Sequence, residues 1–307
     1  MYQIKKLIVC LDQSPLDETL VKFASYVAKI NKSNKVYFAH IIRNLHIPKE
    51  VLKEFPRLVD GMKNERKSQM KQTVEQNWDF SNRSEISYIV KEGQLATKVL
   101  KLTSEKSADM ILVGRKESLS GSGVGVQRLA RRASCSLLII PEHSVPRIGK
   151  ILVPSDFSDY SKDALEEAIF ISERSGGNIE IVCQNVYTIP SGYHFTGKTR
   201  SEFAEIMQAH AEIKYQKFIR KIDTKGIKIS ALYTQDDDED PVEDIIKKAM
   251  EIHADGIIIG AKGRTAATAL FLGSVAERLI QLNDKLPLLV TRPKGKNSGI
   301  LDYILEI

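Results

Sequence analysis

An internal repeat constrains the fold of this 307-residue chain more than any other feature. Three segments of the first half align, in the same order, with three segments of the second half. They are Lys6–Ser14 with Lys150–Ser158, Ala108–Gly114 with Ala254–Gly260, and Ser136–Pro141 with Pro287–Pro293. Self-similarity at one offset indicates a duplicated structural unit. The sequence therefore predicts two domains, residues 1–145 and 146–307, joined by a polar stretch near Pro146 and Gly149.

Each copy alternates strand-like and helix-like segments. The runs Leu7–Leu11 and Ile151–Val153 are continuously apolar, as expected for parallel strands that are buried on both faces. Helical spacing follows each run, and further strand–helix pairs follow in the same way. This alternation predicts an α/β fold in which each domain has a five-stranded parallel sheet flanked by helices. Ligands of such sheets bind at the carboxyl ends of the strands, where the strand order reverses.

The starts of the first helices carry capping signals. In the first copy, Ser14 is expected to cap the helix, with Pro15 in its first turn and Asp17 completing a capping box. In the second copy, Ser158 is expected to do the same. Asp156 comes just before it, and two interpretations stay open: Asp156 approaches this helix start, or it faces a ligand at the strand ends.

Composition narrows the class of protein. The three cysteines are far apart and form no CxxC pair, and no apolar run is long enough to span a bilayer, so we expect a cytoplasmic protein without membrane contact. The net charge of +6 is uneven, roughly +10 in the first copy and roughly −4 in the second. No aromatic-basic interleaving accompanies the basic half, so we expect solvated helix faces rather than a nucleic-acid site.

The second copy contains a glycine-rich loop after its fourth strand. It reads Gly260, Gly263, then Gly273 and Ser274, a G-x2-G-x9-G-S pattern that ends at a predicted helix. Glycines allow a tight turn and a close approach of the backbone to a ligand. The free N–H groups of the helix start favour an anion, and a serine hydroxyl adds a donor. The pattern predicts a cradle for a polyphosphate, with a merely structural loop as the alternative.

The first copy keeps only part of this loop. Gly114 matches Gly260, but Glu117 replaces Gly263, Val124 replaces Ser274, and the loop is shorter. A carboxylate and a missing hydroxyl both disfavour phosphate. We therefore expect a degenerate site, while weak or different anion binding there stays open.

These motifs resemble the universal stress protein family, specifically its tandem-domain members. The resemblance rests on Ile151–Ser158, on Asn185 and Val186 at the end of the second strand, and on the loop from Gly260 to Ser274. It implies Rossmann-like domains of the adenine-nucleotide-hydrolase type, paired through their last strands as an internal pseudo-dimer. Family members with the intact loop bind ATP, and Mg²⁺ would accompany the triphosphate.

The resemblance also implies individual roles. Gly260, Gly263, Gly273 and Ser274 would hold the phosphates and ribose, whereas Asp156 and the backbone of Val186 would border the adenine. The complete expected binding set is Pro154, Ser155, Asp156, Val186, Gly260, Lys262, Gly263, Arg264, Gly273, Ser274 and Val275. No catalytic residue and no protein metal ligand are expected.

Three functions follow from the sequence and the resemblance. The leading hypothesis is an ATP-binding stress or signalling protein with at most slow hydrolysis, acting on a protein partner and open to forming a homodimer. The second is an ATP-dependent hydrolase or nucleotidyl transferase on the same sheet. The third is an interaction scaffold in which both sites are vestigial.

Overall fold

The computed structural model describes residues 3–43, 45, 47–116, 123–237, 240–263 and 272–292. They form two compact units that divide between Pro146 and Arg147. Each unit contains parallel strands flanked by helices, so the predicted α/β architecture is confirmed.

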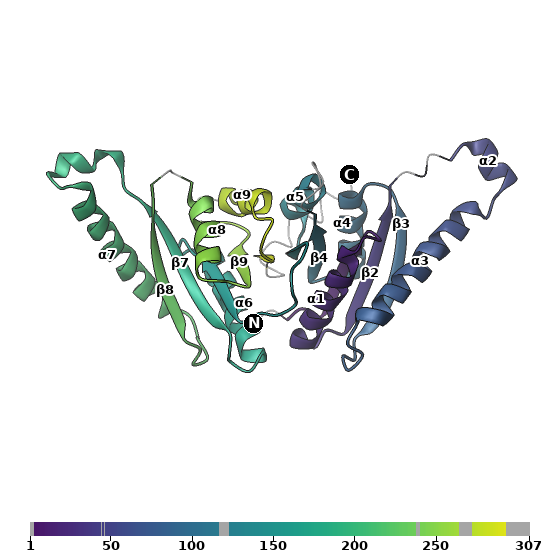
Figure 1. The fold of residues 1–307 in the computed structure, drawn as a ribbon, viewed down its shortest axis with the longest axis horizontal. Helices are drawn as coiled ribbons and strands as arrows, with labels where there is room; N and C mark the ends of the chain where they lie inside the picture. Colours follow the sequence, from purple (N-terminus) through teal and green to yellow (C-terminus); the bar gives the residue numbers. More distant parts are fainter. Residues whose placement is uncertain are drawn as a thin grey trace. The chain divides into compact units, whose positions relative to one another are not determined.

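The first unit has the parallel strand order β3-β2-β1-β4-β5 among its described residues. Its strands are β1 (Lys6–Leu11), β2 (Lys35–Ile42), β3 (Glu85–Glu92), β4 (Met110–Arg115) and β5 (Ser136–Pro141). Its helices are α1 (Leu16–Asn31), α2 (Lys49–Glu54), α3 (Leu58–Asn77), α4 (Leu95–Lys106) and α5 (Gly123–Arg132). Helix α1 packs with α3, and α4 packs with α5 (Figure 1).

The second unit repeats this order as β8-β7-β6-β9-β10, again parallel. Its strands are β6 (Lys150–Pro154), β7 (Glu180–Thr188), β8 (Ile229–Asp236), β9 (Gly256–Gly260) and β10 (Leu288–Thr291). Its helices are α6 (Asp159–Arg174), the 3-10 helix η1 (Ser191–Thr196), α7 (Arg200–Ile219), α8 (Pro241–Glu251) and α9 (Ser274–Leu282). Helices α8 and α9 lie side by side in this unit (Figure 1).

One of the repeated motifs has the same structural role in both units. The carboxylate of Asp109 accepts hydrogen bonds from the backbone N–H groups of Lys5 and Lys6, both at 2.8 Å. In the second unit, Asp255 accepts from Gly149 at 2.6 Å and from Lys150 at 2.8 Å. The repeated Ala-Asp pair therefore fixes the start of the first strand of each unit, which explains why the motif occurs twice.

The strand order of the second unit reverses between β6 and β9. The two strands pair at Ile151 with Gly256 and at Leu152 with Ile257, and both then continue toward Pro154 and Gly260. Chain segments that leave neighbouring strands in opposite directions open a crevice at their carboxyl ends. The fold therefore places the end of β6 and the glycine loop after β9 at the same edge of the sheet.

The first helix of the first unit does not begin as the sequence predicts. Pro15 is at the cap position of α1 and makes no side-chain cap bond. Ser14 Oγ is buried and has no hydrogen-bond partner among the described residues, so the prediction that Ser14 caps this helix is wrong. The carboxylate of Asp17 instead turns back and accepts from the backbone N–H groups of Asp12 (3.0 Å) and Gln13 (2.8 Å). Asp17 therefore stabilises the turn after β1 rather than a capping box.

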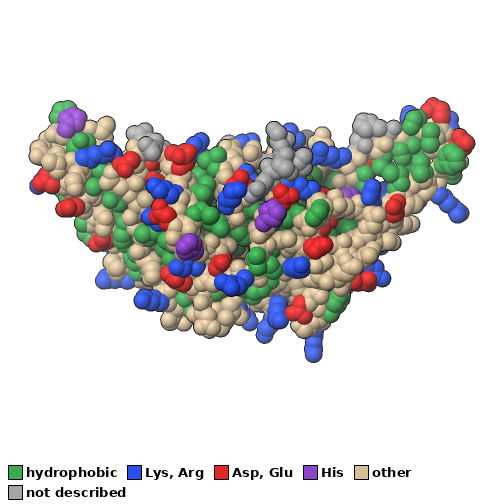
Figure 2. Space-filling model, viewed as in Figure 1, with side chains coloured by type: hydrophobic (Ala, Val, Ile, Leu, Met, Phe, Trp, Pro, Cys, Tyr) green, Lys and Arg blue, Asp and Glu red, His purple; other side chains and the backbone are tan. Residues whose placement is uncertain are grey.

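The surface of the described residues is mixed in charge. Figure 2 shows Lys and Arg side chains interspersed with Asp and Glu over the face in view. Apolar side chains are exposed at single positions, among them Phe55 (54%) and Phe195 (88%). No helix in the described part of the chain has the length and apolar character needed to cross a membrane.

Candidate functional site

A pocket of about 620 Å³ lies in the second unit, where the ends of β6, β7 and β9 meet the starts of α8 and α9. Ten residues of the predicted binding set line it. They are Pro154, Ser155, Asp156, Val186, Gly260, Lys262, Gly263, Gly273, Ser274 and Val275. The eleventh, Arg264, is outside the described residues. The structure thus gathers residues separated by more than a hundred positions into one cavity.

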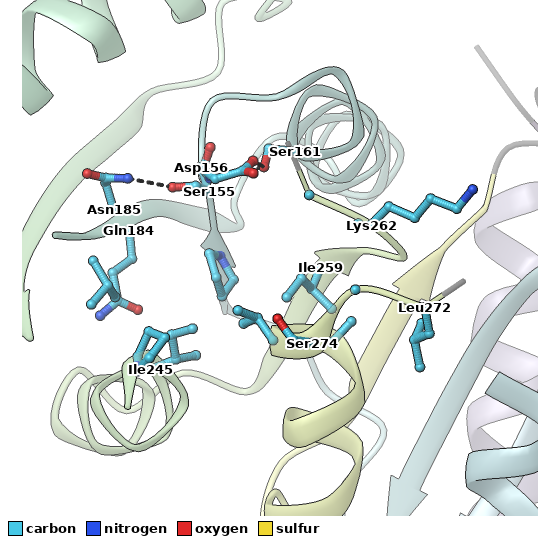
Figure 3. A pocket seen from close by; sticks show the side chains of 18 residues that line it. Ser155, Asp156, Ser161, Gln184, Asn185, Ile245, Ile259, Lys262, Leu272 and Ser274 are labelled. Atoms are coloured by element: carbon cyan, nitrogen blue, oxygen red, sulfur yellow. Dashed lines mark hydrogen bonds between the residues drawn. The ribbon is translucent and has the colours of Figure 1, made fainter. Parts of the chain in front are cut away.

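Asp156 holds the turn between β6 and α6. Its Oδ1 accepts a hydrogen bond from Ser161 Oγ at 2.6 Å (Figure 3). It also accepts one from the backbone N–H of Ser158 at 3.1 Å. Ser158 caps α6 by accepting from the backbone N–H of Ser161 at 3.3 Å, so this predicted cap is confirmed. The carboxylate of Asp156 therefore fixes the helix start, as one interpretation expected; Asp156 also lines the pocket, and its contact with a ligand stays a prediction.

Asn185 fixes the end of β6 from the neighbouring strand. Its Nδ2 donates to the carbonyl oxygen of Ser155 at 2.8 Å (Figure 3). In the first unit, His40 Nδ1 lies 2.9 Å from the carbonyl oxygen of Leu11, so the same link is made by a different side chain. The carbonyl can only accept, so this Nδ1 is the protonated nitrogen. Burial lowers the pKa of His40, although the bond to Leu11 acts in the opposite direction.

Two glycines of the loop are required by contacts within the chain. A Cβ on Gly260 would lie 2.5 Å from the backbone oxygen of Tyr160, at the start of α6. A Cβ on Gly273 would lie 3.2 Å from Lys262 Cα. The absence of a side chain thus lets β9 pack closely on α6, and lets the start of α9 pack on the loop. The sequence predicted a tight turn and a close approach to a ligand, but not these contacts with α6 and with the loop itself.

Gly263 faces the carboxylate of the first turn. A Cβ there would lie 2.9 Å from Asp156 Oδ2, closer than ordinary van der Waals contact. A side chain at this position would therefore displace Asp156 and fill the pocket. The Glu117 that replaces it in the first copy is outside the described residues.

The start of α9 presents its backbone donors to the pocket. Its cap residue is Gly273, and no side chain caps the helix. In contrast, α6, α7 and α8 of the same unit are capped by Ser158, Thr199 and Asp240. The first N–H groups of a helix have no partner within it and carry partial positive charge. Because Ser274 and Val275 line the pocket, these donors and the Ser274 hydroxyl border the cavity (Figure 3).

Lys262 lines the pocket through the start of its chain rather than through its amine. In Figure 3 its side chain leads away from Asp156 and Ser274. Its Nζ lies 5.5 Å from the centre of the Tyr160 ring. Burial, with the nearby charge of Arg292 as the smaller cause, lowers the pKa of Lys262. Lys262 therefore lines the pocket, and its contact with a ligand stays a prediction.

Sequence reasoning missed several residues of the pocket wall. Pro241 and Ile245 of α8 close it on one side, and Gln184 of β7 forms part of its floor. The amphipathic pattern of α8 was visible in the sequence, but not which strand ends the helix would cover. Gln184 interrupts an apolar strand, and this was the available signal.

The corresponding place in the first unit is arranged differently. Lys116 Nζ lies 2.5 Å from Asp12 Oδ2, an ion pair between the counterparts of Lys262 and Asp156. Asp17 stands where the second unit has Ser161, so a second carboxylate occupies the turn. Burial raises the pKa of Asp17 to about 6. Val124, in place of Ser274, is 50% exposed. Two carboxylates at this turn make it less favourable for a phosphate.

The acidic run Asp236–Asp240 serves the start of α8. Asp240 caps that helix and pairs with Arg278, and its backbone N–H donates to Asp236 Oδ1 at 3.0 Å. Asp237 pairs with Arg200 at 2.7 Å. Asp238 and Glu239 are outside the described residues. In the described residues the run therefore has a structural role, in agreement with its interpretation as an acidic helix start.

Comparisons with known proteins agree with this architecture. The model of the universal stress protein family matches residues 3–141 and again residues 147–292. Two universal stress proteins of Methanocaldococcus jannaschii are similar in sequence. MJ0531 is 28% identical over 148 residues, covering 48% of this chain and 84% of the relative, and MJ0577 is 29% identical over 164 residues, covering 48% and 96%.

Solved structures show the same fold. A universal stress protein from Archaeoglobus fulgidus matches with a TM-score of 0.62 at 16% identity, and the match covers 95% of this chain and 98% of that chain. The family match extends over both halves of the sequence, in the two segments that the internal repeat relates. The chain therefore belongs to the universal stress protein family and carries two copies of its domain in tandem.

Proposed function

We propose that the pocket of the second unit binds ATP and that the protein is a nucleotide-dependent regulator in a stress or signalling response. The observation that carries the proposal is one cavity with two chemically distinct ends. One end is apolar, and the other is formed by a glycine turn and an uncapped helix start. Its volume of about 620 Å³ is in the range of small-ligand sites.

The apolar end suits a nucleobase. Pro154, Val186 and Ile245 come from three different elements and meet there. A flat aromatic ring buries much apolar surface between such side chains. The universal stress protein resemblance assigns this end, beside Asp156 and Val186, to the adenine.

The other end suits phosphates. The N–H groups at the start of α9 and the hydroxyl of Ser274 are donors, and Gly263 leaves the space in front of Asp156 open. In the described residues no group of three or more His, Cys, Asp or Glu is placed to hold a metal ion. We therefore propose that Mg²⁺ enters with the triphosphate, with phosphate oxygens as its ligands.

The proposal gives the first unit no nucleotide. Its counterpart turn holds the Asp12–Lys116 ion pair and the Asp17 carboxylate. The pairing of the two domains through their last strands, β5 and β10, stays a prediction.

The proposal assigns binding rather than turnover to the second unit. Asp156 is the carboxylate at the pocket, and its Oδ1 already accepts from Ser161 and Ser158. A carboxylate held in this way positions the turn. Under the competing hypothesis of an ATP-dependent enzyme, turnover would exceed about 1 per second and would depend on Asp156.

A charge-matched pair of variants tests the proposal. Gly263→Glu copies the first domain and places a carboxylate against Asp156, so ATP binding should be lost. Gly192→Glu adds the same charge to η1, outside the pocket lining, where a Cβ meets only Phe195 at 3.7 Å. This control should bind ATP like the wild type. Equal binding by all three proteins, measured by calorimetry, would refute a nucleotide site in this pocket.

A further inference from the structure

Gln184 carries a buried polar atom that the fold leaves without a partner. Its side chain is fully buried on β7 and lines the pocket. Nε2 donates to Thr234 Oγ1 of the adjacent strand β8 at 3.0 Å. Oε1 has no hydrogen-bond partner in the described part of the chain. Buried polar atoms are nearly always paired, so an unpaired one calls for an explanation.

The position of Gln184 places this oxygen at the apolar end of the pocket. Gln184 and Val186 point to the same face of β7, because side chains alternate along a strand. Helix α8 covers that face, and the amide of Gln184 lies beside Ile245 (Figure 3). The phosphate end, at Gly263 and Ser274, belongs to other elements. A ligand group that meets Gln184 is therefore part of the base.

The first unit lacks this feature. His40 and Asn185 make the same bond to the preceding strand, so the residues before them, Ala39 and Gln184, are counterparts. Ala39 is fully buried and has no polar side-chain atom. The amide is thus specific to the unit that has the open pocket, and the shared fold does not require it.

We propose that Gln184 reads the edge of the bound base, and that its Oε1 accepts a hydrogen bond from the exocyclic amino group of a 6-aminopurine. The inference rests on the proposed nucleotide site. In the orientation that the structure shows, Nε2 donates to Thr234 Oγ1, and the end of the amide left for a ligand is the acceptor Oε1. The 6-amino group of adenine supplies the missing donor. The 6-oxo group of hypoxanthine is an acceptor, so it would face the acceptor Oε1 of Gln184 without forming a hydrogen bond. Gln184 is therefore a specificity-determining residue.

The test compares three ligands, ATP, ITP and tripolyphosphate, on the full chain by calorimetry or competition. Wild-type protein should bind ATP about tenfold tighter than ITP, the size expected for one hydrogen bond to a buried group. Gln184→Met keeps the length of the side chain and removes its polar atoms. This variant should lose about tenfold in ATP affinity and bind ATP and ITP alike. Binding of tripolyphosphate, which has no base, should be unchanged.

Two further variants sharpen the result. Thr234→Val removes the acceptor that orients the amide, so the preference for ATP over ITP should shrink. Gln235→Met is the control for Gln184→Met, since it makes the same Gln-to-Met change at the residue after Thr234 on β8. The side chain of Gln235 pairs with Asp237 and does not line the pocket. Its binding of all three ligands should equal that of the wild type.

The outcomes separate this inference from the proposed function. If wild-type protein binds no ATP, the nucleotide site itself is refuted. If it binds ATP but Gln184→Met leaves both the affinity and the ATP-to-ITP ratio unchanged, only the role of Gln184 is refuted. Equal losses of affinity for ATP and ITP in Gln184→Met would mean that Gln184 contacts the ribose rather than the base. A loss of tripolyphosphate binding would mean that Gln184 supports the structure of the whole pocket. Either result overturns the base-reading role.

Discussion

Replacing Gly260 by alanine should destabilise the second unit more than the equivalent change at Gly114 destabilises the first. A Cβ at Gly260 would lie 2.5 Å from Tyr160 O and 2.8 Å from its carbonyl carbon. These distances are about 0.9 Å and about 0.6 Å short of the 3.4 Å at which ordinary contact begins. Both atoms are backbone at the start of α6, so only a shift of the helix relieves the overlap. Overpacking of this kind costs about 2–3 kcal/mol.

Gly114→Ala is the matched control, because the repeat places it at the same point of the fold. Its Cβ would also meet an atom at 2.5 Å, but that atom is Cδ2 of Leu16, the end of a side chain. Leu16 can move by rotation, and alanine lowers the entropy of the unfolded chain, so we expect a cost of about 1 kcal/mol or less.

Hydrogen exchange of the native protein separates the two units. In Gly260→Ala, a loss of about 2 kcal/mol should speed the exchange of the slowest amides of α6 and β9 by about 30-fold. In Gly114→Ala, the amides of α1 and β4 should change by about fivefold or less. Equal effects in the two variants would refute the reasoning that a backbone contact, rather than crowding in general, requires Gly260.

Three other predictions concern the two turns and their links. Gly263→Ala puts a methyl group 2.9 Å from Asp156 Oδ2, so ATP affinity measured by calorimetry should fall about tenfold with little change in melting temperature; unchanged affinity would contradict the close approach. Denaturant unfolding should show a loss of about 1 kcal/mol of stability in Asn185→Ala and in His40→Ala, because each leaves a strand-end carbonyl oxygen without its donor. The exchanges Asn185→His and His40→Asn should keep most of that stability, because each supplies another donor. Burial raises the pKa of Asp17 from 3.8 to about 6. Between pH 4 and 6 the folded state therefore keeps a proton that the unfolded state has lost. The free energy of unfolding should fall as pH rises through this window, by at most about 3 kcal/mol. Unfolding followed by the fluorescence of Trp78, the single tryptophan, should show this slope in wild-type protein and lose it in Asp17→Asn.

Much of the fold was readable from the sequence because the repeat and the apolar runs of the strands are strong local signals. The loop pattern from Gly260 to Ser274 also located one wall of the pocket. What the sequence could not provide was which distant side chains meet there. Ile245 lines the pocket because α8 packs on β7 and β8, and this depends on the packing of the whole unit.

Local sequence rules failed at the start of α1, where the side chains bond other partners than the expected ones. Ser14 satisfies every sequence criterion for a helix cap, yet Asp17 bonds the turn after β1 and leaves the Ser14 hydroxyl unpaired among the described residues. This outcome depends on how the turn after β1 folds back on the first turn of α1, which the capping pattern alone does not encode.

The most direct test of the central claim is the number of ATP molecules that one chain binds. Calorimetric titration of the chain with ATP and Mg²⁺ should reach saturation at one ATP per chain, because among the described residues the open glycine turn and the cavity at the start of α9 belong to the second unit. Two equal sites per chain, or no binding at all, would contradict the account.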